Sequence, residues 1–223
     1  APWDHEPVTD RYVALGDSMA AGPGISPGAD GAPWTAGRSA RNYPHLVAER
    51  LGMDLVDVTY QGATTAHVLR DKQLGAPPQI DALDGSESLV TITIGGNDVG
   101  VVPLLIAGCL PWPARWTLGL GCLIRNLLDA AARDRALAEV ASSLQEVGAT
   151  VRARSPRARV LFVDYLTRLP PKGDKAPPLS DRDADLGRHV AAELERLIGE
   201  AARATGCELV RATAASRSHP AWP

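Results

Sequence analysis

Short apolar runs recur along the chain and alternate with longer stretches in which apolar residues have a helical spacing. Five of the runs are rich in β-branched residues and have the length of buried strands. They lie at residues 12–15, 55–60, 89–94, 159–165 and 208–210. We therefore predict five buried strands, several of which end at a glycine or a polar residue.

Two long segments between these runs place apolar residues on one face of a helix. The first face consists of Leu137, Val140, Leu144, Val147 and Val151. The second face consists of Leu186, Val190, Leu194, Leu197 and Ala201. Ser180, followed by Asp183, predicts the start of the second helix, and Gly206 predicts its end. Each helix is therefore expected to cover one side of a sheet.

The alternation of strands and helices predicts an α/β fold with three layers, in which helices cover both faces of a central parallel sheet. Residues 103–122 and 168–180 interrupt the pattern with prolines and glycines, and we predict loops there. Because strands and helices continue on each side of these loops, we expect one domain over residues 1–223. Ligands of such folds bind at the carboxyl ends of the strands.

Composition and charge exclude several classes of protein. The 223 residues are 45% hydrophobic and 22% charged, with a formal net charge of −3, which is typical of a globular chain. Lysines and arginines are scattered, so no basic surface for a nucleic acid is expected. No stretch approaches the roughly 20 apolar residues that span a bilayer. The first residues, APWDHEPVTD, lack a basic and apolar signal segment, so we expect a mature or trimmed chain. We also expect the protein to be a monomer.

Three cysteines leave two interpretations open. Cys109 and Cys122 bracket a stretch rich in Pro, Trp and Gly, and Cys207 precedes an apolar segment. We prefer the interpretation in which Cys109 and Cys122 form a disulfide and Cys207 is buried and free, which would fit a secreted protein. Three reduced cysteines acting as small apolar residues would fit a cytosolic one equally well.

Three groups that could carry chemistry follow three successive predicted strands. Ser18 follows the first strand in ALGDSM, Gly62 follows the second in YQGATT, and Asn97 follows the third in IGGND. Taken singly, each fits an ordinary turn or helix cap. A parallel sheet, however, brings the carboxyl ends of its strands to one edge. Taken together, the three groups therefore predict a site.

The residue types at these positions suit an acyl-transfer reaction. A serine hydroxyl can attack a carbonyl carbon, and its own backbone N–H helps to bind the negative oxygen that forms. Gly62 allows a ligand to approach its backbone N–H, and the Asn97 amide is an uncharged donor. We expect Asp17 to brace the turn by accepting backbone hydrogen bonds.

ALGDS, the glycine of YQGATT and IGGND resemble the first three sequence blocks of the SGNH hydrolases, also called GDSL esterases and lipases. The runs YVALGDSMAAGPG and RNYPHLVAERLG are similar to those of secreted actinobacterial members. The resemblance implies a flavodoxin-like three-layer fold, secretion, and hydrolysis of small-molecule or lipid carboxylic esters through an acyl-enzyme. It also implies Ser18 as the nucleophile and Ser18, Gly62 and Asn97 as the oxyanion hole.

The general base is the open question of this interpretation. The family takes it from a late block, usually Asp-x-x-His-Pro, and here SRSHP offers His219 with Ser216 in place of the acid. Either His219 works in a dyad, or SRSHPAW is an upstream stretch and the catalytic histidine belongs to a C-terminal segment absent from this chain. His67 is the next candidate, because it follows Gly62 closely enough to line the cleft. The other histidines, which we do not expect to act as the base, are His5, His45 and His189.

The sequence keeps three functions open. The first is an esterase or lipase, with Trp112 and Trp116 of the Pro/Trp-rich loop as an apolar wall for the acyl chain. The second is a hydrolase-like binding protein that lacks the base, and the third is a carbohydrate deacetylase that uses the same site. No ligand spacing for a metal and no nucleotide-binding glycine motif occurs, so we expect no metal and no cofactor.

Overall fold

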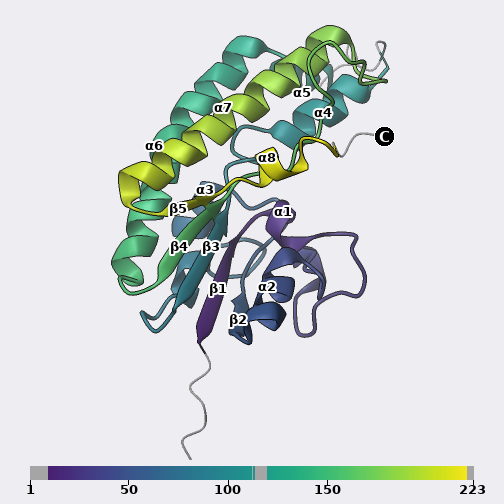
Figure 1. Ribbon diagram of the computed structural model, residues 1–223. Coiled ribbons are helices and arrows are strands. Elements are labelled where there is room, and N and C mark those ends of the chain that lie inside the picture. The colour runs from purple at the N-terminus through teal and green to yellow at the C-terminus, as the bar shows by residue number, and fades with distance from the viewer. Residues whose placement is uncertain (1–9, 112, 114–119, 220–223) are drawn as a thin grey trace, which may run out of the picture.

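The structure is a computed structural model that describes residues 10–111, 113 and 120–219. Its centre is a five-stranded sheet in the order β2-β1-β3-β4-β5, in which all neighbouring strands are parallel (Figure 1). The strands are β1 (Arg11–Gly16), β2 (Asp54–Asp57), β3 (Leu89–Thr93), β4 (Arg159–Val163) and β5 (Glu208–Val210). The prediction of five strands in a parallel sheet is confirmed.

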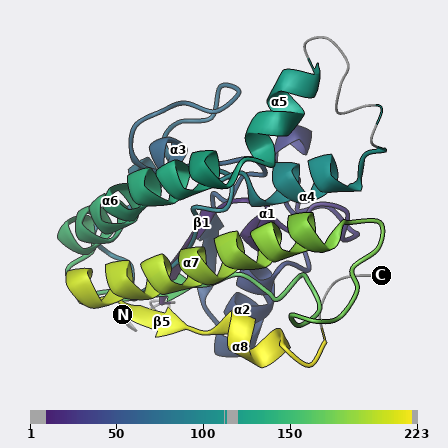
Figure 2. The same cartoon turned by 90° about the horizontal axis from the view of Figure 1, so that it is seen from above.

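Helices cover the two faces of the sheet. Two long helices lie side by side on one face and a shorter one lies on the other, namely α6 (Ala130–Arg154), α7 (Asp181–Thr205) and, opposite them, α2 (Tyr43–Leu51) (Figures 1 and 2). Val13 and Leu15 of β1 join the large core on the side of α6 and α7. Tyr12 and Ala14 point the other way, into a smaller cluster with α2. The predicted three-layer α/β fold is therefore confirmed.

The helix signals of the sequence also match the structure. Every residue predicted on the inner face of α6 is buried. The Ser180 hydroxyl accepts a hydrogen bond from the Asp183 amide at 3.1 Å and so caps the start of α7. Gly206 ends the helix with φ 68°, a left-handed conformation that favours glycine.

The predicted loop over residues 103–122 is wrong, because two helices occupy most of its described part. The remaining helices are α1 (Ser18–Ala21), α3 (Thr65–Leu69), α4 (Val101–Cys109), α5 (Leu120–Leu127) and α8 (Ala212–Ser216), with 3-10 turns at Trp34–Ala36 and Gln79–Ala82. Pro103 is the third residue of α4, where the backbone nitrogen has no acceptor within the helix, so proline costs no hydrogen bond there. Residues 168–180 are irregular, as predicted.

The preferred Cys109–Cys122 disulfide is likewise wrong, since all three cysteines are free in the structure. Cys109 is half-buried at the end of α4, and Cys122 is exposed on α5. Two cysteines form a disulfide only when their Cβ atoms approach within about 4.5 Å. Spacing along the chain carries no information on that geometry.

We expect Gly16→Ala to destabilise the fold, because Gly16 ends β1 where the backbone of β3 passes close by. An added Cβ would lie 2.7 Å from the Thr93 carbonyl oxygen, and a backbone atom cannot move aside cheaply. Overpacking of this kind costs about 1–3 kcal/mol. Urea unfolding measures the change, and Gly28→Ala is the control, because there the new Cβ would meet its nearest atom only at 3.8 Å. Equal unfolding midpoints for the two variants would contradict the prediction.

Candidate active site

The candidate nucleophile Ser18 is the first residue of α1, directly after β1. The Asp17 carboxylate caps this short helix by accepting the Met19 amide at 2.9 Å. The Asp17 amide donates to the Thr93 carbonyl at 2.9 Å, which ties the turn to β3. The Ser18 amide and the Ser18 hydroxyl have no hydrogen-bond partner among the described residues, so both are available to a ligand.

Gly62 lies between β2 and α3 and is exposed. Its φ is 77°, and the nearest atom to an added Cβ would be 3.7 Å away. The requirement for glycine is therefore conformational rather than steric. The Gly62 amide also has no acceptor in the described part of the chain, although the neighbouring Gln61 and Ala63 amides both have one.

Asn97 joins the turn after β3 to the turn that carries Gly62. One N–H of its side-chain amide donates to the Ala63 carbonyl at 2.7 Å. The second N–H remains unpaired among the described residues. Beside it, Asp98 accepts hydrogen bonds from the Thr65 amide at 3.1 Å and from the Thr65 hydroxyl at 2.6 Å. These contacts hold the two turns together.

Two further residues support the Ser18 turn, and no sequence pattern points to either. Gln79 is buried, and its side-chain amide makes two hydrogen bonds to Gly16, accepting at 2.7 Å and donating at 2.9 Å. Tyr165, two residues after β4, donates its hydroxyl to the Asp17 carboxylate at 2.5 Å.

The electrostatics of this turn centre on Asp17, which is 2% exposed. Burial raises the pKa of Asp17 to about 6. The hydrogen bonds from Tyr165 and from the Met19 amide, and the positive charge of Arg168, act in the opposite direction, whereas the Asp98 charge adds to the rise in pKa. Burial also raises the pKa of Tyr165 well above its usual value, so the hydroxyl keeps its proton.

His219 lies beyond α8 and is exposed. Its amide donates to the Ser216 carbonyl at 2.9 Å, and its Nδ1 is 2.9 Å from the Ser218 hydroxyl. Ser216, which stands in place of the family's acid, bonds instead to the Thr167 amide at 2.8 Å. Among the described histidines, none is hydrogen-bonded to Ser18.

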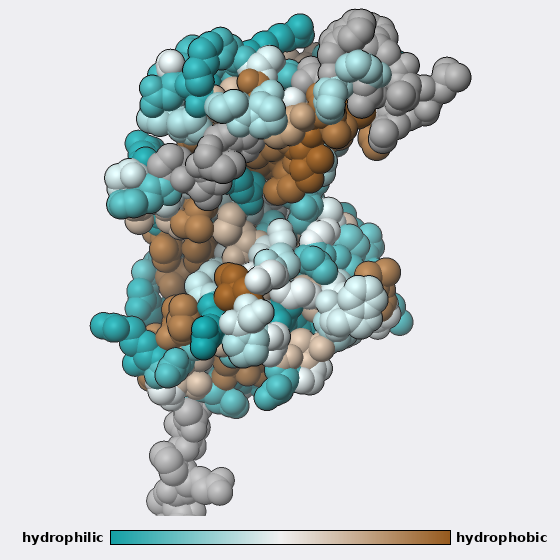
Figure 3. Space-filling model, turned by 90° about the vertical axis from the view of Figure 1, so that its right-hand side faces the viewer, coloured by the Kyte–Doolittle hydropathy of each residue, from teal (hydrophilic) through white to brown (hydrophobic). Residues whose placement is uncertain are grey.

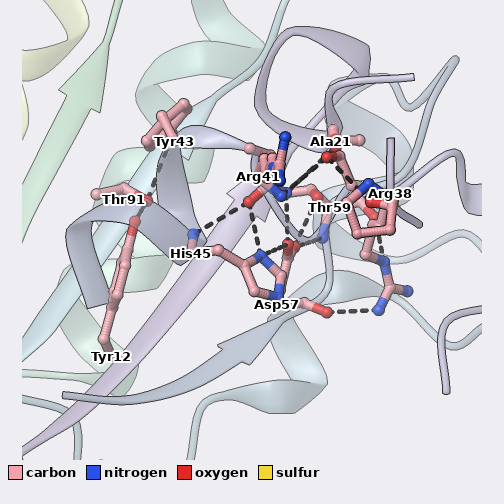
Figure 4. Close-up of polar contacts among 12 residues, drawn as sticks. Tyr12, Ala21, Arg38, Arg41, Tyr43, His45, Asp57, Thr59 and Thr91 are labelled. Carbon is pink, nitrogen blue, oxygen red and sulfur yellow. Dashed lines mark hydrogen bonds and ion pairs between the residues drawn. The ribbon is translucent and has the colours of Figure 1, made fainter. Parts of the chain in front are cut away.

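The other histidines are engaged elsewhere. The Nδ1 of His67 accepts the Thr64 amide at 3.0 Å, so its basic nitrogen is occupied and the proton sits on Nε2. His189 of α7 pairs with Asp134 of α6, and both side chains are exposed. His45 belongs to a network around Asp57 that fastens the segment after α1 to the end of β2 (Figure 4).

Within that network, Asp57 accepts the Asn42 side-chain amide at 2.8 Å and the Thr59 hydroxyl at 2.6 Å. Arg38 donates to the Asp57 carbonyl at 2.6 Å and to the Thr59 carbonyl at 2.8 Å. Figure 4 shows Arg38, His45 and Thr59 around Asp57. These polar side chains therefore have a structural role, since their hydrogen bonds join the segment after α1 to the end of β2.

An apolar cavity of about 210 Å³ adjoins the Ser18 turn through Tyr165. Its apolar lining includes Val101 and Leu105 of α4 and Leu194 of α7, and the charged residues Arg168, Arg188, Glu195 and Arg217 also line it. Neither Ser18 nor Asn97 lines it, so Tyr165 connects the cavity to the turn. Exposed apolar side chains continue along α4 and α5 at Val102, Ile106 and Leu123, and Figure 3 shows apolar surface beside the grey atoms there. Trp112 and Trp116, the predicted acyl wall, lie outside the described residues.

The described residues offer neither a metal site nor a membrane-spanning helix. No three His, Cys, Asp or Glu side chains in that part of the chain lie close enough together to hold a metal ion. No helix there is both long and apolar enough to cross a membrane.

Known proteins that resemble this chain include ester hydrolases of one family. The model of the GDSL-like lipase/acylhydrolase family matches residues 14–223. Lipase 2 of Streptomyces coelicolor is 36% identical over 225 residues, which cover 99% of this chain and 75% of that protein. The match therefore extends over the strands that carry all the candidate site residues.

Solved structures agree with this match. Phospholipase A1 from Streptomyces albidoflavus superposes with a TM-score of 0.75 at 28% identity and covers 95% of this chain and 83% of its own. The extracellular lipase from Streptomyces rimosus gives a TM-score of 0.74 at 24% identity, with 95% and 84% covered. The expected SGNH hydrolase fold is confirmed. The chain belongs to the GDSL-like lipase/acylhydrolase family and is a carboxylic ester hydrolase of the esterase and lipase type.

Proposed function

We propose that this chain hydrolyses small-molecule or lipid esters through an acyl-enzyme formed on Ser18. The observation that carries the proposal is a set of N–H donors that, like the Ser18 hydroxyl, have no partner among the described residues. These donors are the amides of Ser18 and Gly62 and the second N–H of the Asn97 side chain. Donors that are fixed in advance stabilise the negative oxygen of a tetrahedral intermediate without reorganising during the reaction.

In the proposed mechanism the Ser18 oxygen attacks the ester carbonyl while a base takes the hydroxyl proton. The tetrahedral intermediate collapses, the alcohol leaves with a proton returned by the same base, and the acyl group remains on Ser18. Water then attacks the acyl-enzyme by the same sequence and releases the acid. The three N–H donors hold the oxyanion in both halves of the reaction.

We assign the general base to His219. It follows β5 at the same edge of the sheet as Ser18, whereas the basic nitrogen of His67 already accepts the Thr64 amide. Since the His219 ring bonds to Ser218 in the structure, catalysis requires the segment after α8 to bring the imidazole to Ser18. A backbone carbonyl would orient the ring, because no acid stands three residues before it.

We propose that the acyl chain of the substrate binds in the apolar cavity beside Tyr165. A series of p-nitrophenyl esters from acetate to octanoate tests this point. An apolar site gains about 0.8 kcal/mol for each buried methylene, so kcat/KM is expected to rise with chain length. A preference for acetate would instead support deacetylation. We further propose that the chain acts outside the cell, which the relation to an extracellular lipase supports.

The proposed base predicts that His219→Ala lowers kcat/KM by at least about 10³-fold, because the serine hydroxyl is then no longer deprotonated during attack. Hydrolysis of p-nitrophenyl butyrate measures the loss, and His67→Ala is the matched control with activity near that of the parent. Activity that survives His219→Ala but not His67→Ala would move the base to His67. A parent chain without any ester hydrolysis would support a binding protein and contradict the proposed function.

A further inference from the structure

Tyr165 links two turns that are distant in the sequence. Its hydroxyl donates to the Asp17 carboxylate at 2.5 Å and accepts the Gly96 amide at 2.7 Å. Asp17 immediately precedes the candidate nucleophile Ser18, and Gly96 immediately precedes the candidate oxyanion donor Asn97. A single hydroxyl group therefore bridges the two halves of the proposed catalytic machinery.

The direction of both hydrogen bonds is determined by chemistry. The Gly96 N–H can only donate, and an ionised carboxylate can only accept. The Tyr165 hydroxyl does both at once, so it satisfies the Gly96 N–H and the Asp17 carboxylate together, whereas a phenylalanine ring at this position would satisfy neither. Such chains of hydrogen bonds strengthen one another in a low-dielectric interior.

Close packing of the Tyr165 ring against Gly96 holds the bridging hydroxyl in place. A Cβ added at Gly96 would lie 2.9 Å from the Tyr165 hydroxyl oxygen, so only glycine admits the ring at this distance. The far side of Tyr165 is held as well, because its carbonyl accepts the Thr213 hydroxyl at 2.5 Å and the Arg168 guanidinium lies 5.7 Å from the ring centroid. The tyrosine is therefore fixed both at its backbone and at its hydroxyl.

We propose that Tyr165 is a positioning residue for ester hydrolysis, which holds the Ser18 turn and the Gly96–Asn97 turn at the separation that the tetrahedral intermediate requires. The proposal rests on the proposed function of Ser18 and Asn97. Misplacing a catalytic group by about 1 Å can cost about 100-fold in rate, so a bridge between nucleophile and oxyanion donor acts mainly on kcat. Substrate binding in the apolar cavity depends on the ring of Tyr165, which phenylalanine retains.

The test compares Tyr165→Phe with Tyr12→Phe. Tyr12 also has a buried hydroxyl, bonded to Thr91 at 2.8 Å, but it lies near the start of β1, away from the turns. We expect Tyr165→Phe to lower kcat by about tenfold to 100-fold with KM changed by less than about threefold. Titration with an organophosphonate corrects for any unfolded fraction. Equal kcat values for the two variants would overturn the proposal.

A second readout does not depend on turnover. The groups that face Asp17 are Tyr165 and Arg168 from the segment after β4 and Asp98 from the segment after β3. Removing the hydroxyl donor disfavours the ionised carboxylate, so the pKa of Asp17 rises in Tyr165→Phe. Carbon NMR of the Asp17 carboxyl measures it, and an unchanged pKa would overturn the bridge itself. Hydrolysis that is insensitive to Ser18→Ala would instead overturn the proposed function, whatever the result for Tyr165.

Discussion

Ser18→Ala is expected to lower kcat/KM for p-nitrophenyl butyrate by at least about 10³-fold and to abolish labelling by an organophosphonate. The Ser18 hydroxyl is free among the described residues and stands at the start of α1, beside its own unpaired amide. Without the hydroxyl no acyl-enzyme forms, and only the weak effect of the oxyanion donors on attack by water remains.

Mass spectrometry of the labelled parent identifies the modified residue and so separates Ser18 from other serines. Ser142→Ala is the matched control, because Ser142 is exposed on α6 and, within the described part of the chain, its hydroxyl donates to the Glu139 backbone carbonyl of the same helix. Full activity in both variants would exclude Ser18 as the nucleophile.

Asn97→Ala is expected to lower kcat by about 100-fold to 1,000-fold with a smaller effect on KM, since an oxyanion donor acts on the transition state more than on the bound ester. The two N–H groups of Asn97 have different roles in this prediction. One fixes the side chain to the Ala63 carbonyl at 2.7 Å, and we propose that the other binds the substrate oxygen.

The variant Thr65→Val separates these roles. It removes the hydrogen bond of the Thr65 hydroxyl to Asp98, which also joins the two turns, but it leaves every proposed oxyanion donor in place. We expect a loss well below that of Asn97→Ala. If the two losses were equal, the contribution of Asn97 would lie in holding the turns together rather than in donating to the oxyanion.

Patterns of local origin predicted the fold well. The five apolar runs are strands, and the helical faces of α6 and α7 point into the core. These predictions succeed because apolar periodicity and helix caps depend on neighbours within a few residues. The loop predicted over residues 103–122 fails for a related reason. Proline and glycine usually end a helix, whereas Pro103 lies in the first turn of α4, where it breaks no hydrogen bond.

The chemical groups at the ends of β1, β2 and β3 can be predicted from the sequence, because a parallel topology follows from the alternation of strands and helices. The contacts that hold those turns in place depend on long-range packing and are visible in the folded chain alone. Tyr165 reaches Asp17 across 148 residues, and Gln79 reaches Gly16 across 63. Contacts over such separations leave no periodic trace in the sequence, since each depends on the packing of the whole sheet and its helices around one hydroxyl or one amide.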